Sequence, residues 1–342
     1  MLDVTARPAG IAPDAKPVLQ VEDLHVEVGA VEIVRGISYD LYRDETLVMI
    51  GESGSGKTIS AEAVAGIMPS PPGKVTKGSV ISEGVDLLAL KPAARRAFSG
   101  RHLAFVPQDA LASLNPTFSV GWQIAELHHY HLGLSKAEGR RRAIQLLDRV
   151  GIPAAARRVD EYPHEFSGGM RQRVMIAMAI ALDPKIVIAD EPTTALDVTV
   201  QAQILELLID LQKDTGMSLM LITHDLGIAA EIADRIAVMY AGRIVELGRS
   251  GDIIEHPKHP YTYGLLKSFP DIAVKTDKLA SIPGTPPNPL HLPKGCSFGP
   301  RCAFAQDRCA HEPPPSREVG SFHVSACHFA EMVPPTLETE RV

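Results

Sequence analysis

The sequence predicts an α/β fold with a parallel core sheet and a smaller antiparallel sheet beside it. Two short apolar runs, at residues 45–50 and 185–189, each end at a loop and are typical of buried parallel strands. Alternating apolar and polar residues at 24–28 and 37–41 predict antiparallel strands, and residues 78–88 continue that pattern. We therefore expect two sheets of different kinds in the same chain.

The loop after the first buried run is the most informative stretch of the chain. Residues 51–58 have the sequence GESGSGKT, and the alanine-rich run that follows at 59–68 predicts a helix ending before Pro69. A strand, a glycine-rich loop and a helix form the context of a phosphate-binding loop, because its backbone N–H groups and the helix N-terminus face a polyanion. In such a loop Lys57 reaches the β- and γ-phosphates, and the Thr58 hydroxyl ligates Mg²⁺.

The next segment predicts one more core strand and a helical region. Residues 102–107 indicate a strand with Gln108 at its end, where open α/β sheets hold ligands. A turn-rich loop follows, and helices are then expected to about residue 165. Ser135 and Glu138 have capping-box spacing, which predicts the start of an amphipathic helix there.

Two further patterns suggest anion and metal chemistry. Residues 167–172, SGGMRQ, place two glycines before a helix expected at 170–182, which makes a second potential anion site of backbone amides. The strand at 185–189 ends in Asp190 and Glu191. Beside a phosphate loop, an aspartate in this place can hold Mg²⁺ and a glutamate can polarise the attacking water.

Two more polar residues follow in the last part of this α/β region. Asp197 leads into a helix expected at 200–211, and His224 ends a strand expected at 218–223. A lone histidine is more often a structural hydrogen-bonding group, but its place at a strand end makes His224 a candidate site residue.

Length and charge limit the classes of function. The 342 residues suit one large domain with an extension, or two domains. A net charge of −7 argues against free nucleic acid as the main partner, since such proteins usually carry a basic footprint. The longest apolar run, at 174–182, is shorter than the ~20 residues that span a bilayer, so we expect a cytoplasmic chain without a secretory signal.

These elements occur in one specific order: GESGSGKT, Gln108, SGGMRQ, the strand that ends in Asp190 and Glu191, and His224. This order resembles the nucleotide-binding subunit of an ATP-binding cassette (ABC) transporter over about residues 21–250. The resemblance implies a P-loop, RecA-like core with an antiparallel β-subdomain and a helical subdomain at about 110–180.

The resemblance also implies a role for each matching residue. Lys57, Gln108, Glu191 and His224 are expected to be catalytic, with Glu191 as the base and His224 at the γ-phosphate of ATP. Thr58, Gln108 and Asp190 are expected to hold Mg²⁺. The residues expected to contact the nucleotide are Gly51, Ser53, Gly54, Ser55, Gly56, Lys57, Thr58, Ser167, Gly168, Gly169, Gln172 and Asp197. In the family, two subunits face head to tail, and the SGG segment of one covers ATP bound by the other.

The sequence departs from the family pattern at one point. Family members usually stack the adenine on an aromatic residue of the first β-subdomain. The equivalent stretch at residues 26–29 contains no aromatic residue, so Val28 is expected to make a weaker apolar contact.

The composition changes after residue 248, and all four cysteines lie in this last part, at Cys296, Cys302, Cys309 and Cys327. A cytoplasmic chain does not favour disulfides, and a loop rich in Pro and Gly offers little core for four free thiols. Four thiolates suit tetrahedral Zn²⁺ or an iron–sulfur cluster, and the spacing alone does not decide between them.

The C-terminal stretch narrows the resemblance. HPYTYGLLKSFP, the segment from IPGTPP to the third cysteine, and HVSACH resemble the C-terminal extension of ATPases from oligopeptide, dipeptide and nickel importers. The resemblance implies that Cys296, Cys302, Cys309 and Cys327 ligate a [4Fe–4S] cluster, with Zn²⁺ as the alternative. It also implies a second homologous ATPase, two transmembrane permease subunits and an extracytoplasmic peptide-binding protein as partners.

We therefore expect an ATPase that powers peptide import at the cytoplasmic face of the inner membrane, attached through permease subunits. The alternatives are an ATPase that serves a nickel or other small-solute importer, a soluble ABC ATPase that acts on ribosomes or DNA, or a non-catalytic cassette. The expected domains are a disordered tail at 1–19, the ATPase domain at 20–255 and the Pro- and Cys-rich extension at 256–342.

Overall fold

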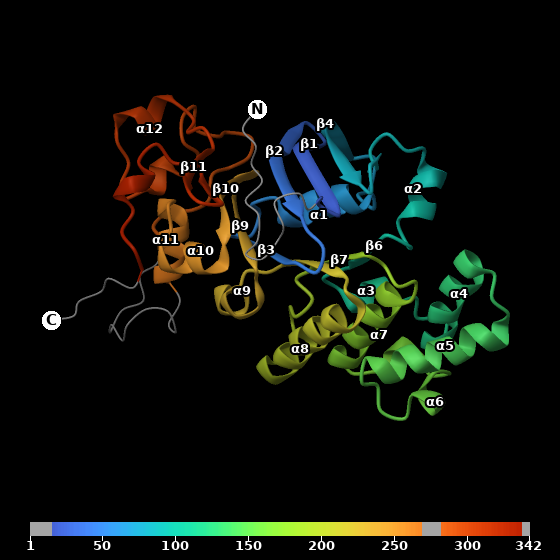
Figure 1. The fold of residues 1–342 in the computed structure, drawn as a ribbon. Helices are drawn as coiled ribbons and strands as arrows, with labels where there is room; N and C mark the ends of the chain where they lie inside the picture. Colours follow the sequence, from blue (N-terminus) through green and yellow to red (C-terminus); the bar gives the residue numbers. More distant parts are fainter. Residues whose placement is uncertain (1–15, 269–281, 337–342) are drawn as a thin grey trace. The chain divides into compact units, whose positions relative to one another are not determined.

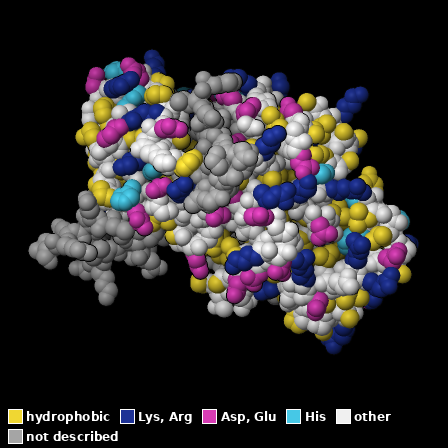
Figure 2. Space-filling view, in the orientation of Figure 1, with side chains coloured by type: hydrophobic (Ala, Val, Ile, Leu, Met, Phe, Trp, Pro, Cys, Tyr) yellow, Lys and Arg dark blue, Asp and Glu magenta, His cyan; other side chains and the backbone are white. Residues whose placement is uncertain are grey.

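The computed structural model describes residues 16–268 and 282–336, and they form two compact units. The first unit contains the described residues up to Leu88 and those from Ile222 onward, and the second contains Ala89–Leu221. Figure 1 shows the ribbon of both, and the face in Figure 2 carries interspersed acidic and basic side chains. None of the helices within the described ranges is long and apolar enough to span a membrane.

The first unit contains a four-stranded antiparallel sheet in the order β2-β1-β4-β5. Its strands alternate inward and outward residues, as the sequence predicts, and Val26 of β1 pairs with Val34 of β2 inside the core. The predicted antiparallel subdomain is thereby confirmed. Its strands are β1 (Leu19–Val28), β2 (Val31–Leu41), β4 (Gly73–Ser82) and β5 (Val85–Asp86).

A second sheet runs through the first unit in the order β11-β12-β10-β9-β3. Strand β3 pairs with β9 in parallel, and both are buried along their whole length, which explains why β3 is a continuous apolar run. The remaining pairings are antiparallel. The bounds are β3 (Thr46–Ile50), β9 (Arg235–Tyr240), β10 (Arg243–Arg249), β11 (Arg317–Gly320) and β12 (His323–Ser325).

The C-terminal segment contributes strands to this sheet, which sequence patterning does not predict. Strand β12 pairs with β10 through Leu247 and Val324, so the core sheet continues into the Cys-rich part of the chain. The strands have only three and four residues, too few for a period of two to stand out. The orange and red parts of Figure 1 show these elements side by side.

A buried ion pair joins the start of β9 to the turn before β3. Arg235 Nε lies 2.6 Å from Glu45 Oε1, and both side chains are excluded from solvent. A second hydrogen bond from Arg235 reaches the Asp40 carbonyl oxygen at the end of β2. Removing one member of such a pair leaves an unpaired buried charge, so the pair fixes the two sheets to each other.

The helices of the first unit lie around these sheets. The sequence predicts a helix over residues 59–68, but α1 begins at Lys57 and ends at Ala65, because Gly66 adopts a left-handed conformation (φ 76°) that caps it. The helices are α1 (Lys57–Ala65), α9 (Leu226–Ile232), α10 (Ser250–Glu255), α11 (Pro260–Lys267) and α12 (Asp307–His311), with short 3₁₀ turns at Gly299–Arg301 and Ala330–Met332.

In the second unit the strands follow the order β8-β7-β6, and β6 and β7 run parallel. Strand β6 pairs with β7 in register from Leu103 opposite Ile186 to Val106 opposite Ala189. The predicted strands at 102–107, 185–189 and 218–223 are therefore present. Their bounds are β6 (Leu103–Val106), β7 (Ile186–Asp190) and β8 (Ser218–Ile222).

The rest of the second unit is mostly helical. The predicted capping box is present: Ser135 Oγ accepts from the Glu138 N–H group, and the Glu138 carboxylate accepts from the Ser135 N–H group. The helices are α2 (Pro92–Phe98), α3 (Ala110–Ser113), α4 (Val120–Leu132), α5 (Lys136–Arg149), α6 (Ala155–Arg158), α7 (Gly168–Ile180) and α8 (Val198–Thr215), with a 3₁₀ turn at Pro163–Glu165.

Candidate functional site

The glycine-rich loop lies between β3 and α1 in the first unit, as predicted. Its entry needs glycine, because a Cβ atom on Gly51 would lie 2.2 Å from the backbone oxygen of Met239 on β9. Its exit needs glycine as well, since Gly56 has φ 103° where the chain enters the helix. The loop therefore turns tightly around the N-terminus of α1 with its backbone close to β9.

Lys57 and Ser55 point into this loop. Lys57 is 5 % exposed, and its Nζ atom donates to the carbonyl oxygens of Gly51 (2.8 Å) and Glu52 (3.2 Å). The Ser55 hydroxyl is buried and has no hydrogen-bond partner among the described residues. A buried cation and an unpartnered hydroxyl inside a turn of backbone amides fit a bound polyphosphate.

His224 belongs to the same unit. It follows β8, its side chain is exposed, and the preceding residue is tied to the strand that enters the loop, because the Thr223 N–H group donates to the Met49 carbonyl oxygen (3.1 Å). The next residue, Asp225, caps α9. The chain around His224 is thus anchored to β3 two residues before Gly51, while the histidine ring remains accessible.

In the second unit, the side chains of Gln108, Glu191 and Thr194 meet at the end of β7. Asp190 is the last residue of the strand and is 2 % exposed, and Glu191 follows with a left-handed backbone (φ 44°). Glu191 Oε2 accepts from the Gln108 side-chain amide (3.2 Å) and from the Thr194 hydroxyl (2.8 Å). A left-handed backbone at a residue other than glycine is found often at functional sites.

The structure brings the predicted pair Gln108 and Glu191 together, and it adds Thr194, which sequence reasoning missed. The signal for Thr194 was its spacing, three residues after a strand-end glutamate.

The SGGMRQ segment begins α7 rather than preceding it. We expected a helix at 170–182, but α7 starts at Gly168 because the Ser167 hydroxyl caps it by accepting from the Met170 N–H group (3.4 Å). Gly168 and Gly169 therefore lie in its first turn, and neither has a side chain that could cover its backbone N–H group. Gln172, on the same helix, is 3 % exposed, and its Nε2 atom has no partner among the described residues.

Asp197 has a structural task in this chain. Its carboxylate caps α8 by accepting from the Val200 N–H group (3.0 Å). A Cβ atom on Gly169 would lie 2.5 Å from the Val200 side chain, so the start of α8 packs against the first turn of α7. Asp197 thus holds the helix that supports the SGG segment.

The predicted site residues therefore fall into two sets. The loop at 51–58 and His224 lie in the first unit, whereas Gln108, Ser167–Gln172, Asp190, Glu191 and Asp197 lie in the second. Each set is held together within its own unit, and the expected sharing of one Mg²⁺ by Thr58, Gln108 and Asp190 stays a prediction. Val28 is the last residue of β1, and its expected contact with the base also stays a prediction.

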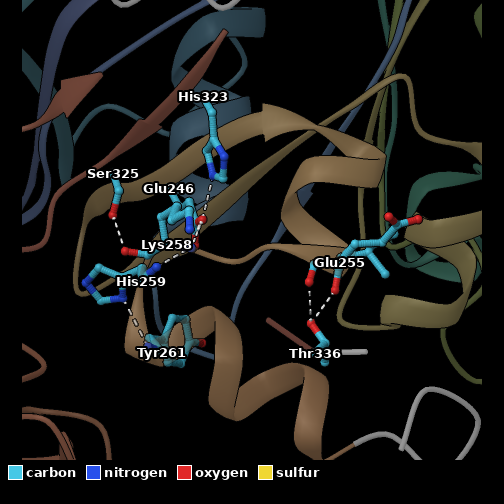
Figure 3. A network of polar contacts seen from close by, with 9 residues as sticks. Glu246, Glu255, Lys258, His259, Tyr261, His323, Ser325 and Thr336 are labelled. Carbon is cyan, nitrogen blue, oxygen red and sulfur yellow. Dashed lines mark hydrogen bonds and ion pairs between the residues drawn. The ribbon is translucent and has the colours of Figure 1, made fainter. Parts of the chain in front are cut away.

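A buried polar network fixes the segment that leads to α11 (Figure 3). The Glu246 carboxylate, 1 % exposed, accepts from the backbone N–H groups of Lys258 and His259 and lies 2.7 Å from His323 Nε2. Burial lowers the pKa of His259 to about 3, so its ring is neutral and Nδ1 accepts from the Tyr261 N–H group (3.1 Å). The side chain of Tyr261 is thereby held in place.

Two residues that sequence reasoning missed contact the glycine-rich loop from the C-terminal segment. The Tyr261 hydroxyl accepts from the Glu52 N–H group (2.7 Å), and Arg301 forms a two-pronged ion pair with the Glu52 carboxylate. Hydrogen bonding to Glu52 raises the pKa of Arg301, so its charge is permanent. No sequence pattern indicates a pair separated by 249 positions.

The four cysteines are free, so the disulfide alternative is not realised. Burial, and after it the other thiols, raises the pKa of Cys302 to about 11 and that of Cys327 to about 12. The Cys296 N–H group donates to the Cys309 carbonyl oxygen (2.8 Å), which joins two of the four segments. The Cys302 and Cys327 thiols are thus both near the Cys296 and Cys309 thiols.

Within residues 16–268 and 282–336, however, no three His, Cys, Asp or Glu side chains are placed to hold a metal ion. The expected iron–sulfur cluster and its zinc alternative are therefore not confirmed.

Two family models match the chain. The family described as "ABC transporter" matches residues 34–194, and "Oligopeptide/dipeptide transporter, C-terminal region" matches residues 245–309. Among curated relatives, the oligopeptide transport ATP-binding protein OppD of Bacillus subtilis is 47% identical over 310 residues, 89% of this chain and 87% of its own. The dipeptide transport ATP-binding protein DppD of Escherichia coli is 47% identical over 91% of this chain and 96% of its own. A putative peptide import ATP-binding protein of Brucella abortus is 48% identical over 95% of this chain and 96% of its own.

Solved structures show the same fold. The ATP-binding cassette MJ0796, in a dimeric post-hydrolysis state with ADP and phosphate, superposes with a TM-score of 0.61 at 24% identity, covering 68% of this chain and 98% of the cassette. Protein cbiO1 of Clostridium perfringens, part of the cbiONQ transporter complex, gives a TM-score of 0.60 at 27% identity, covering 69% of this chain and 90% of cbiO1.

Proposed function

This chain belongs to the ABC transporter family, as an ATP-hydrolysing subunit of its oligopeptide/dipeptide branch, and on that premise we propose that it powers the import of oligopeptides or dipeptides. The proposal of peptides as cargo draws on relatives that are about 47% identical over most of their length and carry oligopeptide or dipeptide transport in their names. The match of residues 245–309 to the C-terminal region of such transporters supports the same cargo.

The proposed role of the glycine-rich loop, the Walker A loop of the family, is to bind the phosphates of ATP. Lys57 would move from the carbonyl oxygens of Gly51 and Glu52 to the β- and γ-phosphates, which attract its ammonium group more strongly. The buried Ser55 hydroxyl would gain its missing hydrogen bond to a phosphate oxygen. The amides of residues 53–58 would complete the site.

Mg²⁺ is the metal that this donor set suits. Thr58 offers a hydroxyl, Gln108 an amide oxygen and Asp190 a buried carboxylate at a strand end, and hard oxygen donors of this kind are those that Mg²⁺ prefers. When bound, Mg²⁺ neutralises charge on the β- and γ-phosphates.

The observation that best supports hydrolysis by this chain is the arrangement around Glu191. Its carboxylate is held by Gln108 and Thr194, and its own backbone lies in a left-handed conformation, so Oε1 and Oε2 are preset in direction. As general base, Glu191 would take a proton from the water molecule that attacks the γ-phosphorus atom. The bond to the β-phosphate oxygen breaks, which leaves ADP, phosphate and a protonated Glu191.

We extend the proposal to the assembly. Two homologous ATPase subunits would meet head to tail, and the first turn of α7 (Gly168 and Gly169, capped by Ser167) would cover the γ-phosphate of ATP bound to the other subunit's Walker A loop. His224 would contact the same phosphate. Closing around ATP and opening after hydrolysis would then drive two permease subunits that receive peptide from an extracytoplasmic binding protein.

The proposed place of the chain is the cytoplasmic face of the inner membrane, where the permease subunits would hold it. The proposed domain boundaries remain those expected from the sequence, with the ATPase domain at 20–255 and the extension beyond.

We further propose that the cysteines bind a [4Fe–4S] cluster, with Zn²⁺ as the alternative. Support comes from the chemistry of the donor set, since all four thiols are free and burial, and after it the other three thiols, raises the pKa of Cys327. Anaerobic purification followed by iron, sulfide and zinc analysis tests this. A brown protein with about four irons per chain supports the cluster, and a colourless protein with one zinc replaces it.

Reconstitution tests the transport function. The chain, its companion ATPase and the permeases are placed in proteoliposomes, and peptide-dependent ATP hydrolysis and peptide uptake are measured. Hydrolysis stimulated by peptide-loaded binding protein supports the proposal. Hydrolysis stimulated by nickel, or by ribosomes or DNA without permeases, replaces it with one of the alternatives.

A further inference from the structure

Two residues of the C-terminal segment, Arg301 and Tyr261, contact Glu52 of the Walker A loop. Arg301 Nη1 lies 2.6 Å from Glu52 Oε2, and Nη2 lies 2.9 Å from Oε1, so the guanidinium group and the carboxylate meet in a two-pronged pair. The Arg301 side chain is only 6 % exposed and that of Glu52 is 26 % exposed. Such charge-assisted, fork-to-fork pairs are among the strongest and most directional polar contacts in proteins.

Arg301 is itself immobilised. Its Nε atom donates to the Pro283 carbonyl oxygen (2.9 Å), and Nη1 also reaches the Tyr240 hydroxyl (3.3 Å). The guanidinium carbon lies 6.0 Å from the centre of the Phe298 ring. Arg301 ends the short turn Gly299–Arg301, directly before Cys302. The charge that faces Glu52 is therefore presented from a fixed point of the Cys-rich segment.

A second contact fixes the backbone of the same loop residue. The Glu52 N–H group donates to the hydroxyl of Tyr261 (2.7 Å), a residue with no solvent exposure. The Tyr261 ring packs against Tyr240 at 4.6 Å between ring centres, and its backbone is bound to the His259 ring shown in Figure 3. Glu52 is thus held at both its backbone and its carboxylate by the C-terminal segment.

The contacts matter for phosphate binding because of where Glu52 lies. Its carbonyl oxygen accepts from Lys57 Nζ, so any movement of Glu52 moves a partner of the phosphate-binding lysine. Its carboxylate is a negative charge in a loop that binds a polyanion, and like charges at short range repel. The pair with Arg301 neutralises that charge locally and fixes the direction of the carboxylate. Pro286 and Pro287 of the C-terminal segment line one pocket together with Glu52 and Ser55 of the loop.

We propose that Arg301 and Tyr261 are positioning residues for ATP binding: together they neutralise and orient Glu52, so that the Cys-rich segment presets the Walker A loop. The proposal rests on the ATP-binding role of that loop. It assigns to a segment outside the ATPase core a direct part in nucleotide affinity. It also makes a specific prediction, because the harm of losing Arg301 comes from the exposed charge of Glu52.

The test is equilibrium binding of a fluorescent ATP analogue to the full-length chain. Arg301→Gln leaves the Glu52 carboxylate unpaired beside the phosphates, and we expect the Kd to rise about tenfold, the size expected from losing one hydrogen bond to a charged group. Adding Glu52→Gln to Arg301→Gln removes the repelling charge, so the double variant should recover most of the lost affinity. A purely structural role for Arg301 gives no such rescue.

Tyr261→Phe provides the second arm, since it deletes only the oxygen that accepts the Glu52 N–H group, and we expect a several-fold rise in Kd. The matched controls are Tyr263→Phe on the same helix, whose ring packs against Phe304, and Arg308→Gln, whose partner Glu312 is exposed in the same segment. Both should bind like the wild-type chain.

The outcomes separate the inference from its premise. A wild-type chain that does not bind ATP contradicts the ATP-site assignment itself. A wild-type chain that binds ATP while Arg301→Gln and Tyr261→Phe bind equally well overturns the positioning role. Weakened binding by Arg301→Gln that Glu52→Gln does not relieve, together with a lowered melting temperature, overturns it too, because the arginine then acts only through stability.

Discussion

The side-chain amide of Gln108 donates a hydrogen bond to Glu191 Oε2 across 3.2 Å, and so joins the end of β6 to the end of β7. The Thr194 hydroxyl donates to the same oxygen. Two donors on one carboxylate oxygen fix the direction of the Glu191 side chain, as its proposed role as the base requires. Movement of Gln108 would change the base directly.

Replacing the proposed base should separate ATP binding from hydrolysis. Glu191→Gln keeps the size and the acceptor oxygen but cannot take a proton, so kcat should fall by about 10²- to 10⁴-fold while ATP still binds. The measurement is single-turnover hydrolysis beside equilibrium binding. Glu206→Gln, an exposed acid on α8 of the same unit, is the control and should behave like wild type. Rapid turnover by Glu191→Gln would remove Glu191 from the role of base.

The Thr194 hydroxyl should affect the rate of hydrolysis through Glu191 alone. Thr194→Val removes one hydrogen bond to the carboxylate, and we expect kcat to fall about tenfold. Combined with Glu191→Gln, it should not lower kcat further, because the group that Thr194 orients is already gone. An additive loss in the combined variant would show that Thr194 acts elsewhere. Thr117→Val, an exposed threonine of the same unit, controls for loss of a hydroxyl.

The entry of the Walker A loop should not tolerate a side chain. Gly51→Ala places a Cβ atom 2.2 Å from the Met239 backbone oxygen, so the loop or β9 must shift. We expect a loss of about 1–3 kcal/mol in the free energy of unfolding and weak ATP binding. Gly251→Ala in α10 has no atom within 4 Å of the new Cβ and should be neutral or slightly stabilising. Equal behaviour of the two variants in thermal melts would contradict the clash.

Buried His259 should make the stability of the first unit depend on pH. Its pKa is about 3 in the folded chain and near 6.5 when unfolded, so between these values only the unfolded chain binds the proton. Stability from this group is therefore complete above pH 6.5 and falls by about 1.4 kcal/mol per pH unit as the pH drops toward 3. His259→Asn keeps an acceptor for the Tyr261 N–H group and should flatten this slope in urea titrations.

The control for that slope is His311→Asn, because His311 is 72% exposed. It should leave the pH dependence unchanged. An equal slope in wild type and His259→Asn would mean that other groups cause the acid loss of stability.

The cysteines can be tested one at a time. Cys302→Ser removes a soft ligand, so the purified protein should lose its iron or zinc and melt at a lower temperature, since a metal that binds only the folded state stabilises it. His328→Asn, whose ring bonds to the Glu312 carbonyl oxygen, should keep full metal content. Full metal content in Cys302→Ser would contradict its assignment as a ligand.

The parts of the fold that the sequence predicts are those determined by residues close together in the chain. Strand β3, the loop and α1 follow from consecutive residues, and the Ser135 capping box follows from two residues three positions apart. The end of α1 at Gly66 was missed because a capping glycine inside an apolar run competes with the helix pattern.

The contacts that sequence could not predict are non-local. The pairing of β12 with β10 joins Val324 to Leu247 and Ser325 to Glu246, residues that lie far apart in the sequence. The contacts of Arg301 and Tyr261 with Glu52 link the last third of the chain to its start. The spacing of apolar and polar residues along the sequence does not indicate contacts between such distant positions. Only the folded chain shows that the Cys-rich segment reaches the Walker A loop.

Uptake of a labelled tripeptide by cells that depend on this chain for the ATPase role tests the central claim most directly. The account predicts uptake with the wild-type chain and none with Glu191→Gln, although both are present in equal amount and bind ATP. Uptake that continues with Glu191→Gln, or a wild-type chain that hydrolyses ATP without supporting uptake of any peptide, would contradict it.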